Sequence, residues 1–160
     1  MRTDAEKGEI ELEFFRRFAA LVDLPLDANS AEKRPPPEPD ILCKHEQEGY
    51  IAFELVEICD PKLAQIITDA AKSAADEPVF VRTSDPSKLI LGKKLQKKYL
   101  TKYPVELLCY TNGRVITPPD VIIPTIRPLL DSEIGAFRRV WLLGHKRGMD
   151  VVYPVWDARE

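Results

Sequence analysis

Residues 39–58 read PDILCKHEQEGYIAFELVEI, two apolar runs separated by a polar segment that contains Gly49. The pattern predicts a β-hairpin with a short strand at 41–43, a loop at 45–49 and a longer strand at 50–58. The second run is almost wholly apolar, which is typical of a strand in the middle of a sheet. Glu54 interrupts this run. An ionised carboxylate at such a position requires a cation, a proton or several hydrogen-bond donors.

The register of this hairpin supplies a reason for Glu54. If loop 45–49 closes the hairpin, Lys44 lies opposite Tyr50, and stepping back along the strands places Asp40 opposite Glu54. Directly opposed residues point to the same face, with Cβ atoms about 4.5–5.5 Å apart. Adjacent carboxylates repel, and Mg²⁺ or Mn²⁺ relieves the repulsion because these ions prefer carboxylate, carbonyl and water oxygens. We therefore expect Asp40 and Glu54 to bind a divalent metal ion, with the Leu55 carbonyl as a third ligand. The alternatives are that Glu54 faces solvent on an uncovered face of the sheet and that Asp40 is an ordinary turn residue, and a bulge or a different loop length would separate the two acids.

The N-terminal segment offers a further acid. Thr3 and Glu6 have the spacing of a capping box, which predicts a helix that begins at Thr3. The apolar residues that follow recur at helical spacing and define one buried face: Phe14, Phe15 and Phe18. Glu11 lies on that face, so we expect it to reach the neighbouring sheet edge. The alternative is that Glu11 is an exposed helix acid.

The rest of the chain alternates between helical and strand patterns. Residues 27–39 are polar and end in a proline-rich run, which predicts an extended connector that delivers Asp40 to the hairpin. Further helices are predicted at 60–73, 85–103 and 119–138, and further strands at 79–81, 105–110, 139–143 and 151–155. This order predicts an α/β fold with a mixed central sheet flanked by helices. We expect residues 1–160 to form a single domain.

Residues 86–103 are strongly basic. They contain six lysines and no acidic residue, in a chain whose net charge is −3. The apolar residues at helical spacing should face the sheet: Leu91, Leu95 and Tyr99. That placement predicts an outward ridge made of Lys93, Lys94, Lys97 and Lys98. A phosphate backbone is one polyanion that fits such a ridge, and its binding is strongly salt-dependent. The alternative is a solvated helix face with no partner.

Composition limits the class of protein. With 44% apolar residues the chain is not a disordered segment. No apolar run approaches the roughly 20 residues that span a bilayer, and no secretory leader is evident, so we expect a cytoplasmic protein without a membrane partner. The three cysteines are irregularly spaced and only two histidines are present, which argues against a structural zinc site.

The hairpin resembles a known family. Pro39-Asp40, followed after thirteen residues by Glu54 on an apolar strand, resembles the PD-(D/E)xK nuclease superfamily, which includes Holliday-junction resolvase-like proteins. Gly8 and Glu11 before the phenylalanines are similar to the first helix of that family. The resemblance implies a restriction endonuclease-like fold and cleavage of phosphodiesters that depends on Mg²⁺ or Mn²⁺. It also implies nucleic acid as the partner, with DNA favoured over RNA, and allows a homodimer.

The chain departs from the family pattern at one position. The family has a lysine two residues after the motif acid, and Val56 stands there. Lys44 is a poor substitute because four strand residues separate it from Asp40, about 13 Å. Glu57 would need a bulge to reach the site, which leaves a lysine from a later helix. Gln96, three residues before Tyr99, resembles a Gln/Tyr helix of exonuclease relatives.

Val56 therefore leaves two interpretations open. The first is a metal-dependent nuclease in which Asp40, Glu54 and Glu11 are the catalytic acids. The second is a module that has lost catalysis but keeps the fold, and that binds nucleic acid or a protein partner.

Overall fold

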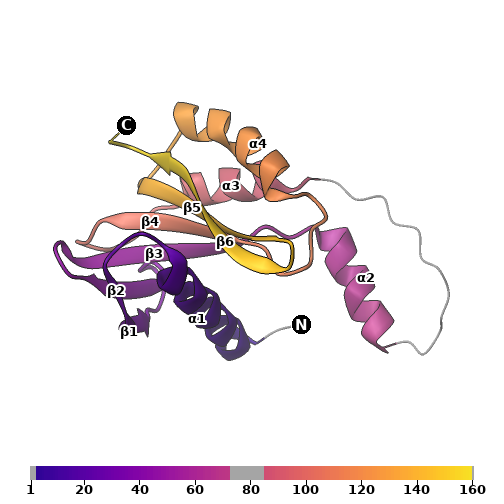
Figure 1. Cartoon of the computed structure of the whole chain (residues 1–160), viewed down its shortest axis with the longest axis horizontal. Helices are drawn as coiled ribbons and strands as arrows, with labels where there is room; N and C mark the ends of the chain where they lie inside the picture. The colour runs from indigo at the N-terminus through magenta and orange to yellow at the C-terminus, as the bar shows by residue number, and fades with distance from the viewer. Residues whose placement is uncertain (1–2, 73–84, 160) are drawn as a thin grey trace.

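The structure, a computed structural model, describes residues 3–72 and 85–159, which form a six-stranded sheet with helices on both faces (Figure 1). The strands lie side by side in chain order, from β1 to β6. The central strands β3, β4 and β5 are parallel, and the outer pairs are antiparallel. The elements, in chain order, are α1 (Asp4–Leu21), β1 (Leu26–Lys33), β2 (Ile41–His45), β3 (Gly49–Glu57), α2 (Pro61–Lys72), α3 (Ser87–Gln96), β4 (Val105–Tyr110), α4 (Pro119–Ser132), β5 (Phe137–Lys146) and β6 (Met149–Asp157). The predicted α/β class with a mixed sheet is confirmed.

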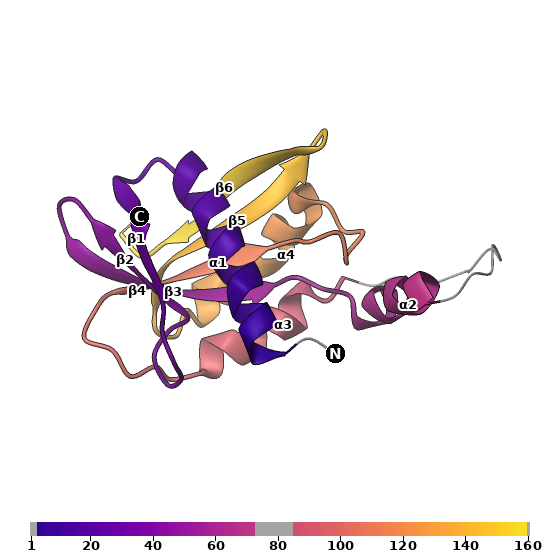
Figure 2. The same cartoon turned by 90° about the horizontal axis from the view of Figure 1, so that it is seen from below.

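Helix α1 covers one face of the sheet (Figure 2). The predicted capping box is present, since Thr3 accepts from the Glu6 amide and Glu6 accepts from the Thr3 amide. Its phenylalanines are buried, and the Phe15 and Phe18 rings pack against Phe53 of β3 at centroid distances of 4.9 and 5.8 Å. Each fully buried aromatic ring contributes about 2–3 kcal/mol of transfer free energy. These contacts fix α1 over the middle of the sheet.

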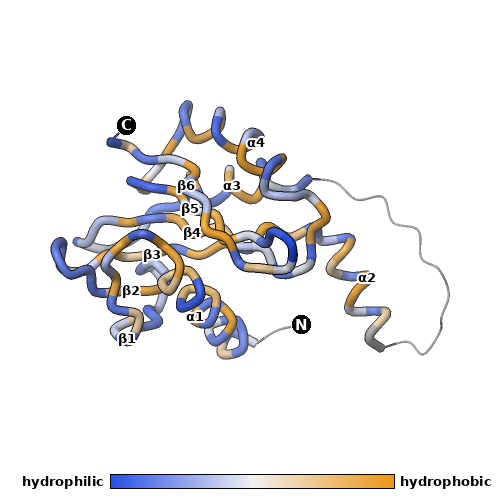
Figure 3. The backbone as a smooth tube through the Cα atoms, viewed as in Figure 1, coloured by the Kyte–Doolittle hydropathy of each residue, from blue (hydrophilic) through white to orange (hydrophobic). Residues whose placement is uncertain are grey.

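Helices α3 and α4 cover the opposite face. Leu91 and Leu95 of α3 are buried there, together with Ile122 and Ile126 of α4. The hydropathy colouring shows the apolar strands between polar outer segments (Figure 3). Helix α2 begins beside the turn after β4, where the Asp60 amide donates to the Arg114 carbonyl, and it extends beyond the end of the sheet (Figure 1). None of the helices in the described ranges is long and apolar enough to cross a membrane.

The predicted hairpin register is confirmed. Lys44 pairs with Tyr50, and Ile41 pairs with Phe53, so the next step back along β2 reaches Asp40. The loop is shorter than predicted because His45 and Gly49 also pair, but this leaves the register unchanged. Gly49 adopts a φ of 82°, a left-handed conformation that glycine tolerates best.

The prediction of a connector at 27–39 is wrong for its first part. Residues Leu26–Lys33 form strand β1, which pairs with β2 at the edge of the sheet. Its polar side chains gave no apolar alternation to indicate a strand, but edge strands commonly carry polar and charged residues, which discourage pairing with another chain. Only residues 34–39 form a loop that leads to Asp40.

Two predicted helix ends are also wrong. The helix predicted at 85–103 ends at Gln96, because Lys97 adopts an extended backbone and the chain runs on without regular structure to Pro104. The helix predicted at 119–138 ends at Ser132, and Phe137 already belongs to β5. Helix α4 continues through Pro124 and Pro128, and both prolines lie on its exposed side. The strand predicted at 79–81 lies outside the described residues.

Candidate functional site

Asp40 and Glu54 lie side by side at the start of β2, as the register requires. The Asp40 amide donates to Glu54 Oε1 at 3.1 Å, and the Leu55 amide donates to Asp40 Oδ2 at 2.9 Å. The N–H and C=O of one strand residue point to the same edge, so the Leu55 carbonyl also faces the side where Asp40 lies. The two carboxylates and this carbonyl are therefore within one small region of the sheet.

Glu54 is almost completely buried, with 1% of its surface exposed, and it is surrounded by donors. Lys94 Nζ lies 2.9 Å from Glu54 Oε2, and Lys97 Nζ lies 3.3 Å from the same oxygen. The Tyr99 hydroxyl donates to that oxygen at 2.9 Å. Burial and the neighbouring Glu54 charge raise the pKa of Tyr99 well above its ordinary value of 10, so the phenol stays protonated and remains a donor.

Lys94 brings an ammonium group to Glu54 from helix α3. Side chains at 54 and 56 point to the same face of β3 because strand side chains alternate. Val56 packs in the cluster under α3, and Lys94 reaches over from that helix to Glu54. The ammonium group therefore arrives beside the acid from the helix above rather than from position 56.

Glu11 approaches from the other face of the sheet. It is buried on α1 with 4% of its surface exposed, as its place on the apolar face predicted. Lys33, the last residue of β1, connects it to the hairpin: Lys33 Nζ is 3.4 Å from Glu11 Oε2 and 3.8 Å from Asp40 Oδ1. One ammonium group thus bridges two of the three candidate acids.

Three residues of the basic segment lie elsewhere than predicted. Lys94 and Lys97 do not belong to an outward ridge, because both turn towards Glu54. Gln96 is exposed at the end of α3 and does not lie near the inner edge. Lys93 and Lys98 are exposed, as predicted. The early end of α3 explains the difference, since the extended backbone after Gln96 lets Lys97 and Tyr99 approach the same carboxylate.

Glu57 is not brought into the site. The pairing of β3 with β4 is regular through Glu57, with no bulge, and Glu57 forms an ion pair with Arg114. Glu57 and Arg114 nevertheless line a cavity of about 350 Å³ that adjoins the site. Glu11, Leu55 and Lys94 also line this cavity. This cavity lies at the carboxyl ends of β3 and β4, where open α/β sheets commonly bind ligands.

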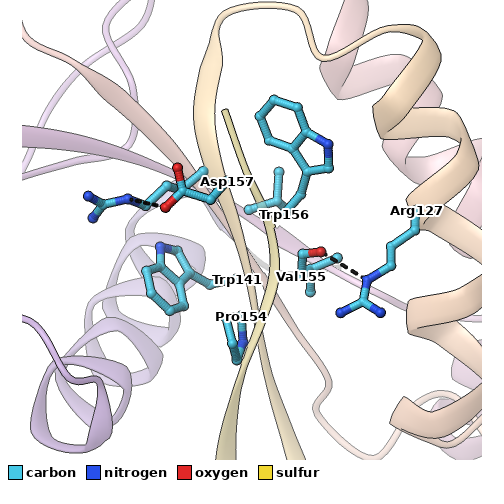
Figure 4. A pocket seen from close by; sticks show the side chains of 8 residues that line it. Arg127, Trp141, Pro154, Val155, Trp156 and Asp157 are labelled. Atoms are coloured by element: carbon cyan, nitrogen blue, oxygen red, sulfur yellow. Dashed lines mark hydrogen bonds and ion pairs between the residues drawn. The ribbon is translucent and has the colours of Figure 1, made fainter. Parts of the chain in front are cut away.

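A second cavity lies at the opposite edge of the sheet, against β6 (Figure 4). It measures about 260 Å³ and includes two tryptophans, Trp141 and Trp156. Its cations already have partners: Arg127 Nε donates to the Val155 carbonyl at 3.0 Å, and Arg139 Nε is 3.2 Å from Asp157 Oδ2. It holds no acid pair like that of the hairpin, so we do not take it as the candidate site.

The donor chemistry of the hairpin fits a hard divalent cation. Mg²⁺ is usually bound by one or two carboxylates together with substrate phosphates and water, and Asp40, Glu54 and the Leu55 carbonyl supply such oxygens. Over residues 3–72 and 85–159, no group of three or more His, Cys, Asp or Glu side chains is arranged to hold a metal ion. Lysines neutralise the acids instead, and a bound cation would take over that role.

The residues that the sequence analysis missed are Lys33, and Tyr99 as a hydrogen-bond donor. Lys33 lies in the segment that was interpreted as a connector, so nothing indicated that it ends a strand beside Asp40. Helical spacing predicts that Tyr99 faces the sheet, and its ring does pack against the core there, but the spacing gives no sign that its hydroxyl donates to Glu54. Comparison of the chain with protein-family models, with curated proteins and with solved structures finds no match to any of them.

Proposed function

We propose that this chain hydrolyses phosphodiester bonds in nucleic acid with the help of Mg²⁺ or Mn²⁺ held by Asp40, Glu54 and the Leu55 carbonyl, on a restriction endonuclease-like fold. One observation carries the proposal: two adjacent carboxylates at the start of β2 have an ammonium group, that of Lys94, 2.9 Å from one of them. This set combines metal-binding oxygens with a cation that can stabilise charge on a phosphate.

Each residue has a distinct task in this proposal. A bound metal ion supplies charge that polarises the phosphate and lowers the pKa of water. Lys94 and Lys97, which contact Glu54, would place positive charge beside the phosphate. Glu11 holds Lys33 beside Asp40, which makes it a positioning residue in this scheme. The exposed lysines, Lys93 and Lys98, bind the flanking backbone.

A cleavage assay tests the proposal. Supercoiled plasmid and end-labelled single-stranded DNA and RNA are incubated with Mg²⁺, Mn²⁺ or EDTA. We expect cleavage that requires metal and falls at least about 100-fold in Asp40→Asn and in Lys94→Met, in line with the loss of charge stabilisation in a reacting site. Glu13→Gln, an exposed acid on the same helix as Glu11, is the matched control and should cleave like the wild type. Cleavage by Asp40→Asn at the wild-type rate, or no cleavage by the wild type on any substrate, refutes the proposal.

A second candidate function rests on the same contacts. Glu54 already accepts from two ammonium groups, a phenol and a backbone amide, so it is satisfied without a metal ion. This observation favours a module that binds nucleic acid without cleaving it. Titration calorimetry with Mn²⁺ separates the two: stoichiometric binding that Asp40→Asn removes supports the nuclease. Absence of metal binding, together with salt-sensitive DNA binding that Lys93→Glu and Lys98→Glu weaken, supports the binding module.

A further inference from the structure

A row of tyrosines and lysines leads to Glu54 along the hairpin. Tyr50 and Glu54 are four residues apart on β3 and point to the same face, about 13 Å from each other. Lys44 is paired directly with Tyr50 and therefore shares that face. The segment that follows α3 runs over this part of the hairpin. We call the row Lys44, Tyr50, Tyr103, Lys102 and Lys97 the tyrosine–lysine track.

The Tyr50 ring is exposed, the neighbouring Tyr103 ring is partly buried, and a lysine lies over the Tyr103 ring. The Tyr50 and Tyr103 rings are 5.7 Å apart, and Tyr50 keeps 40% of its surface exposed. Lys102 Nζ lies 5.3 Å from the centroid of the Tyr103 ring. Closer to the site, Lys97 Nζ lies 5.3 Å from the Tyr99 ring and also contacts Glu54. Rings and ammonium groups thus lie next to each other both at the hairpin and beside the acids.

The segment that carries most of the track is held in place. The Leu100 amide donates to the Pro37 carbonyl at 3.0 Å, which ties the segment to the loop that leads into β2 (Figure 2). The Tyr103 amide donates to Thr101 Oγ1 at 3.2 Å. Residues 97–104 contain three lysines and no acid, so the segment presents positive charge only. The backbone that carries these rings and lysines is therefore held before any ligand arrives, which lowers the entropy cost of binding.

This arrangement distinguishes between forms of nucleic acid. Single strands offer unpaired bases that stack on aromatic rings, while their phosphates contact lysines along a groove. The bases of a duplex are stacked inside the helix, and a duplex meets a protein mainly through its phosphates and groove edges. Exposed ring faces such as that of Tyr50 add affinity for a single strand and none for an intact duplex.

We infer that the tyrosine–lysine track binds a single-stranded stretch of nucleic acid and leads its backbone to the acids of the candidate site. The inference rests on the proposed function, and it specifies the substrate as a strand whose bases are unpaired next to the scissile phosphate. Bases stack on Tyr50 and Tyr103, and the phosphates lie along the lysines.

Binding measured without cleavage tests the inference. Fluorescence anisotropy is recorded in EDTA with labelled oligo-dT, oligo-U and a duplex of the same length. We expect at least one of the two single strands to bind more tightly than the duplex, and the two arms show whether DNA or RNA is preferred. Tyr50→Ala should weaken single-strand binding about 5- to 150-fold, the range found when one stacking residue is removed, and leave duplex binding unchanged. Tyr50→Phe keeps the ring and should bind like the wild type.

Charge variants provide a matched pair. Lys102→Ala should weaken single-strand binding and reduce its dependence on salt, because one phosphate contact is lost. Lys146→Ala, at an exposed lysine that ends β5, should do neither. Tighter binding of the duplex than of both single strands, or wild-type single-strand affinity in Tyr50→Ala, overturns the inference.

The two proposals fail in different ways. If Asp40-dependent cleavage occurs while Tyr50→Ala binds single strands normally, the track is wrong and the proposed function stands. If Tyr50 is needed for single-strand binding in EDTA but no substrate is cleaved with metal, the proposed function is wrong and single-strand binding by the track stands.

Discussion

Lys94→Met should destabilise the fold because it removes the ion pair between Lys94 Nζ and Glu54 Oε2. This prediction can be tested without knowing the substrate. Methionine keeps much of the length and apolar body of lysine but removes the charge. The change leaves Glu54, which is 1% exposed, with one ammonium partner instead of two. The remaining partner, Lys97, has half of its side chain exposed, so solvent screens its interaction.

The size of the effect follows from the geometry. At 2.9 Å and an effective dielectric constant of about 20, the attraction between Lys94 and Glu54 is about 6 kcal/mol before desolvation is subtracted. Desolvation of both groups offsets much of this attraction, and removing one partner of a buried ion pair costs about 3–5 kcal/mol. Because Glu54 keeps three other donors, we expect a loss near the lower end, about 3 kcal/mol. Lys97→Met should cost at most about 1 kcal/mol, because that pair is half exposed.

Urea unfolding of four proteins measures the pair: wild type, Lys94→Met, Glu54→Gln and the double variant. Lys94→Met should lower the midpoint without changing the slope, since the surface exposed on unfolding is unchanged. Once glutamine replaces Glu54, no buried carboxylate remains for Lys94 to neutralise, so the second change should cost about 1 kcal/mol. The coupling energy is therefore expected to be about 2 kcal/mol. Additive losses, or equal losses for Lys94→Met and Lys97→Met, refute the view that Lys94 neutralises Glu54.

Two further predictions concern stability away from the site. Gly135 has a φ of 64°, and an added Cβ would clash with the Leu95 carbonyl oxygen, so Gly135→Ala should lower the free energy of unfolding by about 2 kcal/mol or more. Gly113 has a φ of 70° but open space around it, so Gly113→Ala should cost about 1 kcal/mol in the same unfolding assay. Hydrogen bonds of 2.6 and 2.8 Å from Arg17 hold the pKa of Asp150 below its ordinary value of 3.8. The pair therefore stabilises the fold above about pH 4, and this stabilisation is lost as the pH falls through the lowered pKa. Asp150→Asn should therefore cost about 1 kcal/mol at pH 7, with a difference from wild type that shrinks towards pH 2; a constant difference over this range contradicts the assignment.

The hairpin and its acid pair were predictable because they depend on local rules. Alternation and loop position fix the register of residues 41–57, and the register alone brings Asp40 next to Glu54. The burial of Glu11 followed in the same way, from helical spacing with the phenylalanines. In each case the relevant residues lie on one element or on two elements joined by a short loop.

The cations around these acids were not predictable, because they come from elements whose relative placement depends on the whole core. Lys94 lies at the border of the apolar stripe on α3, and the sequence does not specify how that helix is turned over Glu54. Lys33 lies on a strand with no apolar alternation, which only its pairing with β2 reveals. The early end of α3 depends on contacts of Leu100 and Tyr99 with distant residues, Pro37 and Glu54.

The two outermost strands have a consequence for how the protein behaves at high concentration. The free edge of a sheet exposes unpaired backbone N–H and C=O groups, to which a strand of another chain can add. Proteins discourage such strand addition with charges, prolines and irregular pairing. Strand β1 is rich in charged and polar residues and has an irregularity between Asp27 and Glu32, while β6 carries Pro154 beside a shift at Trp141. Both borders are therefore poor templates for strand addition, and concentrated solutions of the folded chain should resist fibril growth at either border.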